Sequence, residues 1–216
     1  HCHNKLHSPQ IIKIFTSNLC NSTCVTCGPS SSTKWQSLKN IPIEKTTLDF
    51  NLLNSVKWSD VKILTFVGGE PLLEKKNLDL LEHLSEVNKN CFISFVTNGS
   101  ITLTSLQKKV FSKLKNLNIC ISIDGIGKQF EYIRYPLKWE DLIENISQYK
   151  EIGCMLSVSF TISNLNILYY KEITNWFKSQ NLSYNHIFVT NPIEFNIEVL
   201  PTEVKKHLPL VKQPNY

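Results

Sequence analysis

The sequence predicts an α/β protein whose parallel β-sheet is covered by helices. Six short β-rich runs recur along the chain, at residues 11–15, 61–67, 91–97, 117–123, 155–162 and 186–189. Each run is nearly continuous in apolar residues, which is typical of buried parallel strands, and helical patterns lie between the runs. Six such units in 216 residues are too few for a full eight-fold barrel, which needs about 250 residues. The sequence therefore leaves two architectures open, an incomplete barrel and a doubly wound sheet.

The helices between the runs are predicted from apolar residues that recur at helical spacing. Two such faces consist of Leu78, Leu81, Leu84 and Val87, and of Trp139, Leu142, Ile143, Ile146 and Tyr149. Further helices are expected within 103–114 and 169–178, and the connection 28–60 has room for one more. We expect a core domain over 8–200, preceded by a tail or remnant of an upstream segment (1–7) and followed by a short helix and tail (201–216).

The composition excludes several classes of protein. Hydrophobic residues make up 42% of the chain and charged residues 19%, so it can bury a core. No apolar run approaches the ~18 residues that span a bilayer, and no signal peptide is visible. The net charge of +5 comes from scattered lysines and a single arginine, without the basic stripe that follows a phosphate backbone. We therefore expect neither a membrane nor a nucleic-acid partner.

The seven cysteines indicate a reducing, cytoplasmic setting. Their number is odd and their spacing uneven, unlike a secreted disulfide scaffold. Cys91, Cys120 and Cys154 stand in or beside apolar stretches, where a free cysteine usually acts as a small buried hydrophobe. Three others fall within eight residues of one another and form the first candidate site.

Polar residues and glycines gather where the predicted strands end. In either parallel architecture, ligands bind at the carboxyl ends of the strands. The first four runs lead into residues 18–20, 68–71, 97–99 and 122–125, and five of the seven glycines lie at positions 28, 68, 69, 99 and 125. Glycine at such a place lets the backbone approach a ligand closely.

The three clustered cysteines, Cys20, Cys24 and Cys27, can all reach one metal centre. Thiolate ligands select zinc, copper(I) or iron–sulfur clusters. A structural zinc ion takes four protein ligands, and a fourth is missing locally. A [4Fe–4S] cluster held by three cysteines leaves one iron open for a substrate or a cofactor.

This CxxxCxxC motif after the first strand, followed by Gly-Gly-Glu-Pro (68–71) after the second, resembles the radical S-adenosylmethionine (radical SAM) superfamily. The likeness continues through residues 97–99, 122–125 and 132–136, looks most like the SPASM/twitch group, and covers about residues 11–190. It implies an α/β fold of a particular kind, a partial (β/α)6 TIM-type barrel of parallel strands with outer helices.

The resemblance also implies the cofactors and their ligands. A [4Fe–4S] cluster would be bound by Cys20, Cys24 and Cys27, and S-adenosylmethionine (SAM) would chelate the fourth iron. Gly68, Gly69 and Glu70 match the motif that holds the methionine amino group, and a carboxylate is a suitable partner for an ammonium.

Four more positions match the family's SAM-binding residues. Ser122 and Asp124 match positions along the ribose and methionine side of SAM, and Asn98 is a weaker member of that set. Arg134, the only arginine of the chain, matches an arginine near the SAM carboxylate, which suits its forked guanidinium.

The sequence departs from the family pattern in two places. Thr26 stands before the third cysteine, where the family usually has an aromatic residue or sometimes methionine packed near the adenine. We expect Thr26 to bind SAM more weakly there. After Cys27 only isolated cysteines follow, so no C-terminal auxiliary cluster is expected in this chain.

The function implied is reductive cleavage of SAM to a 5′-deoxyadenosyl radical that abstracts hydrogen from a peptide or a small molecule. A flavodoxin- or ferredoxin-type protein would donate the electron. Two alternatives stay open. One is a non-catalytic iron–sulfur or zinc module whose site is closed by His1, Cys2, His3 or His7. The other is a degenerate radical SAM domain that binds a partner without turnover.

Overall fold

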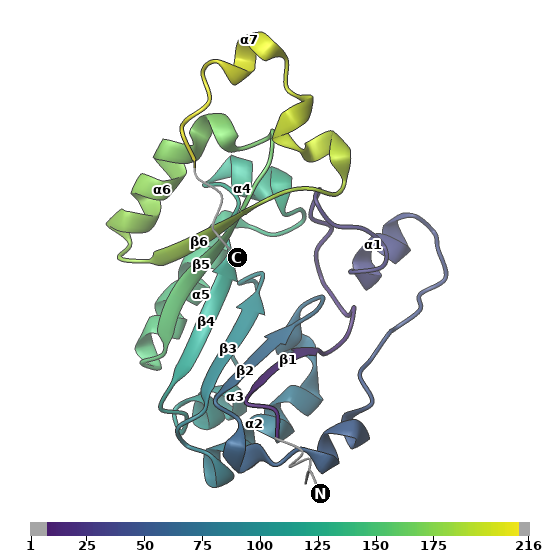
Figure 1. Ribbon diagram of the computed structural model, residues 1–216, viewed down its shortest axis with the longest axis vertical. Coiled ribbons are helices and arrows are strands. Elements are labelled where there is room, and N and C mark those ends of the chain that lie inside the picture. Colours follow the sequence, from purple (N-terminus) through teal and green to yellow (C-terminus); the bar gives the residue numbers. More distant parts are fainter. Residues whose placement is uncertain (1–7, 212–216) are drawn as a thin grey trace, which may run out of the picture.

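The computed structural model describes residues 8–211. Six strands within this range form a single parallel β-sheet (Figure 1). The strands follow one another across the sheet in chain order: β1 (Ile11–Phe15), β2 (Ile63–Val67), β3 (Phe92–Thr97), β4 (Leu117–Ser122), β5 (Met155–Ile162) and β6 (Ser183–Phe188). A doubly wound sheet reverses its strand order at a switch point. This sheet never reverses, so its topology is that of a barrel wall.

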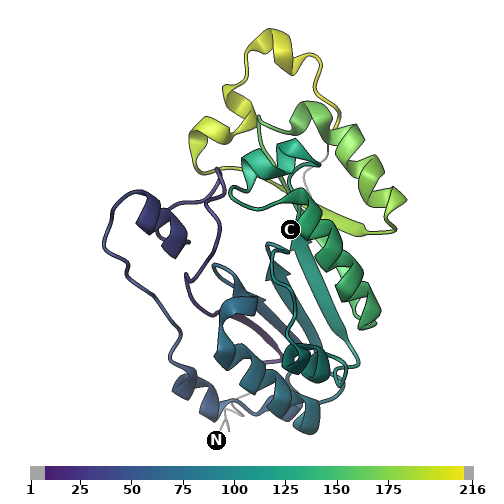
Figure 2. The same ribbon diagram turned by 180° about the vertical axis from the view of Figure 1, so that it is seen from behind.

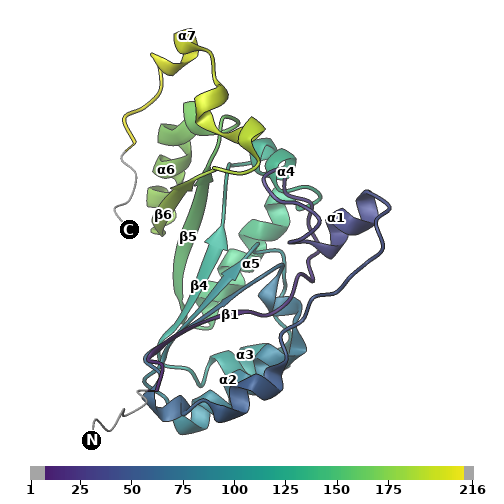
Figure 3. The ribbon, with the colours of Figure 1, turned by 45° about the vertical axis from the view of Figure 1, so that its right-hand side comes forward.

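Four helices cover the outer face of the sheet, namely α2 (Lys75–Val87), α3 (Ser105–Phe111), α5 (Trp139–Glu151) and α6 (Tyr170–Ser179). Right-handed crossovers that always advance in one direction place their helices on the same face, and Figure 2 shows these helices in front of the sheet. Figure 3 shows that the strands curve and twist, and that α1 (Thr33–Leu38) stands apart from the outer layer. Two shorter helices, α4 (Lys128–Ile133) and α7 (Thr202–Lys205), lie near the strand ends and in the C-terminal segment.

The core lies between the sheet and its outer helices. Alternate strand residues point into it and are buried, among them Leu64, Phe66, Ile93, Phe95, Ile119, Ile121, Val158 and Phe160. The residues between them, such as Thr65, Asn118, Ser122 and Ser157, face the other side and are half-buried. The strands are therefore fully buried on one face only, because no layer of the described residues covers the concave face of the open barrel.

Most element boundaries match their predictions. The bounds of β1 and β5 are as predicted, and those of β2 to β4 differ by one or two residues. Strand β6 starts three residues earlier than predicted, because Ser183 and Asn185 face solvent and give no apolar signal. Helix α4 was not predicted, since its six residues are too few to show a helical period. The domain boundaries stay a prediction.

The isolated cysteines are less buried than predicted. Cys91 is buried, but Cys120 and Cys154 are only half-buried. Cys120 belongs to the open face of β4, and the Cys154 thiol donates to the Tyr149 carbonyl oxygen at 3.1 Å. Within residues 8–211 no helix has the length and apolar character needed to cross a membrane.

Truncating Phe66 tests where the core lies. Its ring is fully buried and stacks on Phe95 with 4.5 Å between the ring centroids. We expect Phe66→Ala to lower the free energy of unfolding by about 3–5 kcal/mol, because truncation leaves a cavity. Phe15→Ala is the matched control on a 49% exposed ring and should cost less than about 1 kcal/mol. Urea denaturation measures both, and equal losses would contradict this placement of the core.

Candidate functional site

A pocket of about 150 Å³ opens at the carboxyl ends of β1 to β4. It is bounded by the loop after β1, the glycine turn after β2, the ends of β3 and β4, and the end of α4. Its lining residues are Cys20, Ser22, Cys24, Cys27, Ser31, Ser32, Gly68, Gly69, Val96, Thr97, Asn98, Ser122 and Arg134. The structure thus brings the three clustered thiols together with residues from four other segments of the chain.

The three thiols differ in exposure and in neighbours. Cys24 is buried, Cys20 is half-buried and Cys27 is exposed. The hydroxyl of Ser22 lies between two of them, 3.3 Å from Cys20 Sγ and 3.4 Å from Cys24 Sγ. Among residues 8–211, no three His, Cys, Asp or Glu side chains close around a point as ligands of a single metal ion. The residues proposed to close a zinc site, His1, Cys2, His3 and His7, lie outside the described residues.

The cysteine loop is fixed by main-chain hydrogen bonds to the last residue of α4 and to the segment that follows it. Thr23 N donates to the Tyr135 carbonyl at 2.6 Å, and Val25 N donates to the Ile133 carbonyl at 2.9 Å. These bonds flank Cys24 on both sides. They hold the middle of the loop in place without any help from the thiols.

Neighbouring groups set the charge of the thiols. The pKa of Cys24 is lowered, first by a hydrogen bond from Cys27 and also by the positive charge of Arg134. The same hydrogen bond raises the pKa of Cys27. Burial raises the pKa of Cys20. Cys24 is therefore the thiol most readily deprotonated, and a thiolate is the form that binds a soft metal.

The glycine turn after β2 is built for close approach to the loop after β1. Gly69 N donates to the Ser17 carbonyl and Glu70 N to the Leu19 carbonyl, both at 2.7 Å. Gly68 has φ +138°, which favours glycine, and a Cβ on Gly69 would collide with the Leu19 carbonyl. The two glycines are required by contacts between backbones inside the protein, whatever ligand the pocket holds.

Glu70 lies behind the pocket wall. It is 1% exposed and is not one of the lining residues. Its carboxylate accepts hydrogen bonds from Thr97 Oγ1 at 2.8 Å, Asn98 N at 2.7 Å and Leu72 N at 3.1 Å. Burial raises the pKa of Glu70 to about 7, although these hydrogen bonds favour the charged form. Its role as partner of a SAM amino group stays a prediction.

Arg134 is held by two groups of opposite character. Its Nη2 lies 2.6 Å from Asp124 Oδ2, and its Nη1 lies 3.8 Å from Cys24 Sγ. Asp124 is 1% exposed and also accepts from Thr161 N at 2.8 Å, so it stands behind the arginine and off the pocket wall. Burial opposes the charge of Arg134, but Asp124 raises its pKa above the ordinary value. Arg134 Nε is buried and has no hydrogen-bond partner among the described residues.

The predicted SAM-binding residues fall into two groups. Gly68, Gly69, Asn98, Ser122 and Arg134 line the pocket with the three cysteines. Glu70 and Asp124 stand one layer behind it, and Thr26 lies half-buried in a turn of the cysteine loop without lining the pocket. Their roles in binding SAM stay predictions.

Sequence reasoning missed several lining and linking residues. Ser22, Ser31 and Ser32 line the pocket, and Thr97 joins it to Glu70. Asn21, inside the cysteine motif, donates to Ser100 Oγ at 2.8 Å and accepts from Asn98 Nδ2 at 2.8 Å. Only the position of Asn21 beside Cys20 could have singled it out, since small polar residues are common in loops.

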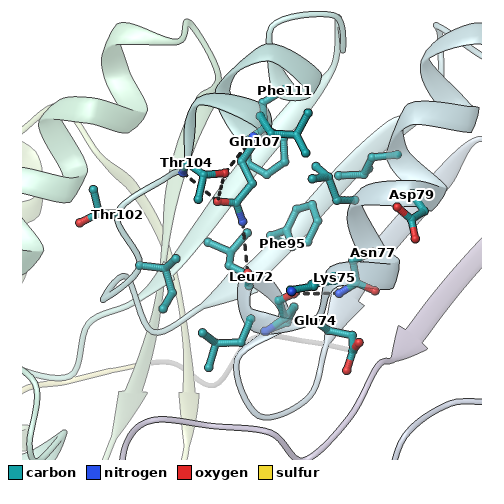
Figure 4. Close-up of a pocket in the computed structure, with 16 residues that line it drawn as sticks. Leu72, Glu74, Lys75, Asn77, Asp79, Phe95, Thr102, Thr104, Gln107 and Phe111 are labelled. Atoms are coloured by element: carbon teal, nitrogen blue, oxygen red, sulfur yellow. Dashed lines mark hydrogen bonds between the residues drawn. The ribbon is translucent and has the colours of Figure 1, made fainter.

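A second cavity of about 480 Å³ lies outside the sheet, between α2 and α3 (Figure 4). Its walls are mainly apolar, with Phe95 and Phe111 among them, and Gln107 Nε2 donates to the Leu72 carbonyl at 3.2 Å. None of its lining residues belongs to the cysteine pocket. The two cavities are separate features of the fold.

The chain belongs to the Radical SAM superfamily, whose family model it matches over residues 14–177. Among curated proteins, it is 25% identical to an AdoMet-dependent heme synthase of Oleidesulfovibrio alaskensis, over 80% of this chain and 43% of that protein. It is 24% identical to a GTP 3′,8-cyclase of Aquifex aeolicus, over 98% of this chain and 70% of that protein. The superfamily predicted from the motifs is thereby confirmed.

Solved structures share the fold. The anSMEcpe protein with bound AdoMet and Cp18Cys peptide matches 84% of this chain and 51% of its own, with a TM-score of 0.64 and 18% identity. Streptococcus suis SuiB bound to precursor peptide SuiA matches 96% of this chain and 43% of its own, with a TM-score of 0.65 and 14% identity. The predicted partial barrel is confirmed. The chain spans only about two fifths of the heme synthase and about half or less of each of these solved chains, 51% and 43%.

The residues present fit the cofactors that the superfamily implies. Three cysteine thiols on one pocket are a suitable donor set for an iron–sulfur cluster. Beside them, the unpartnered Nε of the buried Arg134 can donate a hydrogen bond to a carboxylate. The glycine turn completes the wall between these groups without adding side chains.

The glycine turn gives a stability test. Gly69→Ala places a methyl group against the Leu19 carbonyl, so the β1 and β2 loops must separate. We expect a loss of about 1–3 kcal/mol in the free energy of unfolding of the metal-free protein. Gly28→Ala is the control, because nothing lies within 4 Å of a Cβ there. Urea denaturation compares the two, and an unchanged Gly69→Ala would rule out the close approach.

Glu70 predicts a pH dependence of stability. Its folded-state pKa of about 7 lies above the ordinary 4.5, so its contribution is fully present below pH 4.5 and is lost as pH rises through 7. Relative to Glu70→Gln, the wild type should lose roughly 3 kcal/mol of unfolding free energy across this range. Urea denaturation of both proteins between pH 4.5 and 8 measures the difference. Parallel curves would show that Glu70 does not titrate this way.

Proposed function

We propose that this chain is a radical SAM enzyme that binds a [4Fe–4S] cluster through Cys20, Cys24 and Cys27. The observation that carries the proposal is the convergence of three thiols, the glycine turn and Arg134 on one pocket at the strand ends. When bound, the cluster would supply one electron for reductive cleavage of SAM. The protein would then bind, orient and protect the reacting groups.

The side chains of the pocket prepare both binding steps. Arg134 favours the thiolate form of Cys24, and Asp124 holds Arg134 in place by an ion pair. The Nε of Arg134 would bind the SAM carboxylate. Ser122 and Asn98 would bind SAM from the ends of β4 and β3, where their polar groups line the same wall.

Three of the predicted SAM-binding residues, Asp124, Glu70 and Thr26, do not line the pocket. Each has a different role in this proposal. Asp124 would act on SAM through Arg134, which it contacts directly. Glu70 would meet the SAM amino group only if the residues that bury its carboxylate move aside, since it is 1% exposed. Thr26 would approach the adenine from the turn of the cysteine loop, with less contact area than an aromatic residue.

The substrate we propose is a peptide, with a small molecule as the other class. Peptides are bound in two solved relatives of the same fold, anSMEcpe and SuiB. The chain motifs resemble those of the SPASM/twitch group and support membership of it, and a flavodoxin- or ferredoxin-type protein would supply electrons. The free thiols of this chain are consistent with a reducing cytoplasm.

Reconstitution tests the proposal. The protein is loaded with iron and sulfide without oxygen, then given SAM and a strong reductant, and 5′-deoxyadenosine is measured. We expect product from the wild type and a loss of at least about 100-fold in Cys20→Ala, Cys24→Ala and Cys27→Ala, because a cluster ligand is removed. Cys154→Ala is the control, since Cys154 is outside the pocket, and should retain full activity.

Three outcomes would contradict the proposal. Zinc bound in place of iron and sulfide would favour a zinc module. A bound [4Fe–4S] cluster without product would indicate a degenerate domain that does not turn over. Product formation that survives all three cysteine substitutions would show that the thiols of this pocket are not the cluster ligands.

A further inference from the structure

We propose that Glu70 is a positioning residue for Cys20, acting through Asn98 and Asn21, and that its carboxylate serves the protein interior instead of a ligand. The three hydrogen bonds to that carboxylate all come from the chain itself. At 1% exposure, its remaining acceptor sites cannot meet a group in the pocket unless this network opens.

The first half of the link joins Glu70 to Asn98. Asn98 N donates to Glu70 Oε2 at 2.7 Å, the shortest of the three hydrogen bonds to the carboxylate. Thr97 Oγ1 donates to Glu70 Oε1 at 2.8 Å and itself accepts from Gly99 N at 3.1 Å. Glu70 thus fixes the backbone where β3 ends, and with it the direction of the Asn98 side chain.

The second half joins Asn98 to the cysteine loop. Asn98 Nδ2 donates to Asn21 Oδ1 at 2.8 Å, and Asn98 Oδ1 accepts from Ser100 N at 2.9 Å. Asn21 Nδ2 donates to Ser100 Oγ at 2.8 Å, which closes a ring of three side chains and one backbone group. Every amide group in the ring has a partner, and such a network resists distortion.

Glu70 therefore acts on both sides of Cys20. Its backbone N–H holds the Leu19 carbonyl at 2.7 Å, and its carboxylate holds Asn21 through Asn98. The hydrogen bonds made by the Cys20 main chain itself are longer, because Cys20 N and Cys20 O both meet Thr33 Oγ1 at 3.3 Å. The shorter bonds of its neighbours fix Cys20 more firmly.

Cys24 does not depend on this link. It lies between the two main-chain hydrogen bonds that Thr23 and Val25 donate to the end of α4 and the residues just after it, and Trp35 Nε1 donates to its carbonyl at 3.0 Å. A substitution of Glu70 that breaks its hydrogen bonds should therefore displace Cys20 and leave Cys24 in place. The consequence for a cluster rests on the proposed function, but the displacement itself does not.

Alkylation of the metal-free chain tests the link. Iodoacetamide labelling at fixed pH, read at each cysteine by mass spectrometry, gives a rate for each thiol. We expect Asn21→Ala and Glu70→Gln each to raise the rate at Cys20 by about fivefold, the effect of one lost hydrogen bond on a local opening. Cys24 should change less than about twofold. The double variant should match Glu70→Gln alone, because both changes break one chain of contacts.

Controls separate positioning from charge and from unfolding. The charge of Glu70 contributes to the raised pKa of Cys20, but Asn21→Ala leaves that charge intact. Cys91, buried in the core, reports global opening. Asn118→Ala removes hydrogen bonds to Ser94 and Ser157 on the open face of the sheet, and should leave Cys20 unchanged. Should Glu70→Gln fail to fold, Asn21→Ala decides the question.

Two results would overturn the proposal. One is an unchanged Cys20 rate in Asn21→Ala, and the other is a parallel rise at Cys91, which would reduce the effect to general destabilisation. If Glu70 instead binds the amino group of SAM directly, Glu70→Gln will weaken SAM binding to the loaded protein in calorimetry, with Cys20 alkylation unchanged. Because alkylation uses neither cluster nor SAM, its outcome is independent of whether the chain cleaves SAM.

Discussion

The candidate site depends on the close contact between the glycine turn after β2 and the loop after β1. Two hydrogen bonds of 2.7 Å, from Gly69 N and Glu70 N, bring these segments together. The contact is possible only without side chains at positions 68 and 69, since a Cβ at either would meet the Ser17 or Leu19 backbone. The position of Cys20 depends on that approach, because it brings the Glu70 N–H to the carbonyl of Leu19, the residue before Cys20.

Arg134 shows how a single charge can serve several groups in the same pocket. Its guanidinium contacts Asp124 on one side and Cys24 on the other. A buried ion pair adds little net stability, because desolvation offsets most of the attraction. The ion pair here serves to position groups. It orients the planar guanidinium of Arg134 toward the pocket and places its positive charge beside the Cys24 thiol. A lysine could supply the charge but not two directed contacts and a third free N–H.

The sequence predicted those parts of the protein that local patterns encode. Apolar runs located five of the six strands to within two residues, and the cysteine spacing together with Gly68-Gly69-Glu70 located the pocket. The direction of Glu70 was not predictable, because it depends on donors from Thr97 and Asn98 on another strand. Strand β6 and helix α4 were missed or shortened because exposed Ser183 and a six-residue helix carry no periodic signal.

The cysteine loop connects two sides of the pocket, one at Cys20 and one at Cys24. Apart from this loop, the two sides are held in place by different parts of the chain. Cys20 is tied through its neighbours to the ends of β2 and β3, whereas Cys24 is tied through its neighbours to the end of α4 and the residues just after it, and by its thiol to Arg134. The thiol hydrogen bonds of Ser22, at 3.3 and 3.4 Å, are weak connections between the two sides. A group bound by all three thiols would join them covalently, so its binding free energy would add to the stability of the fold. The same loop that binds the group would then be ordered by it.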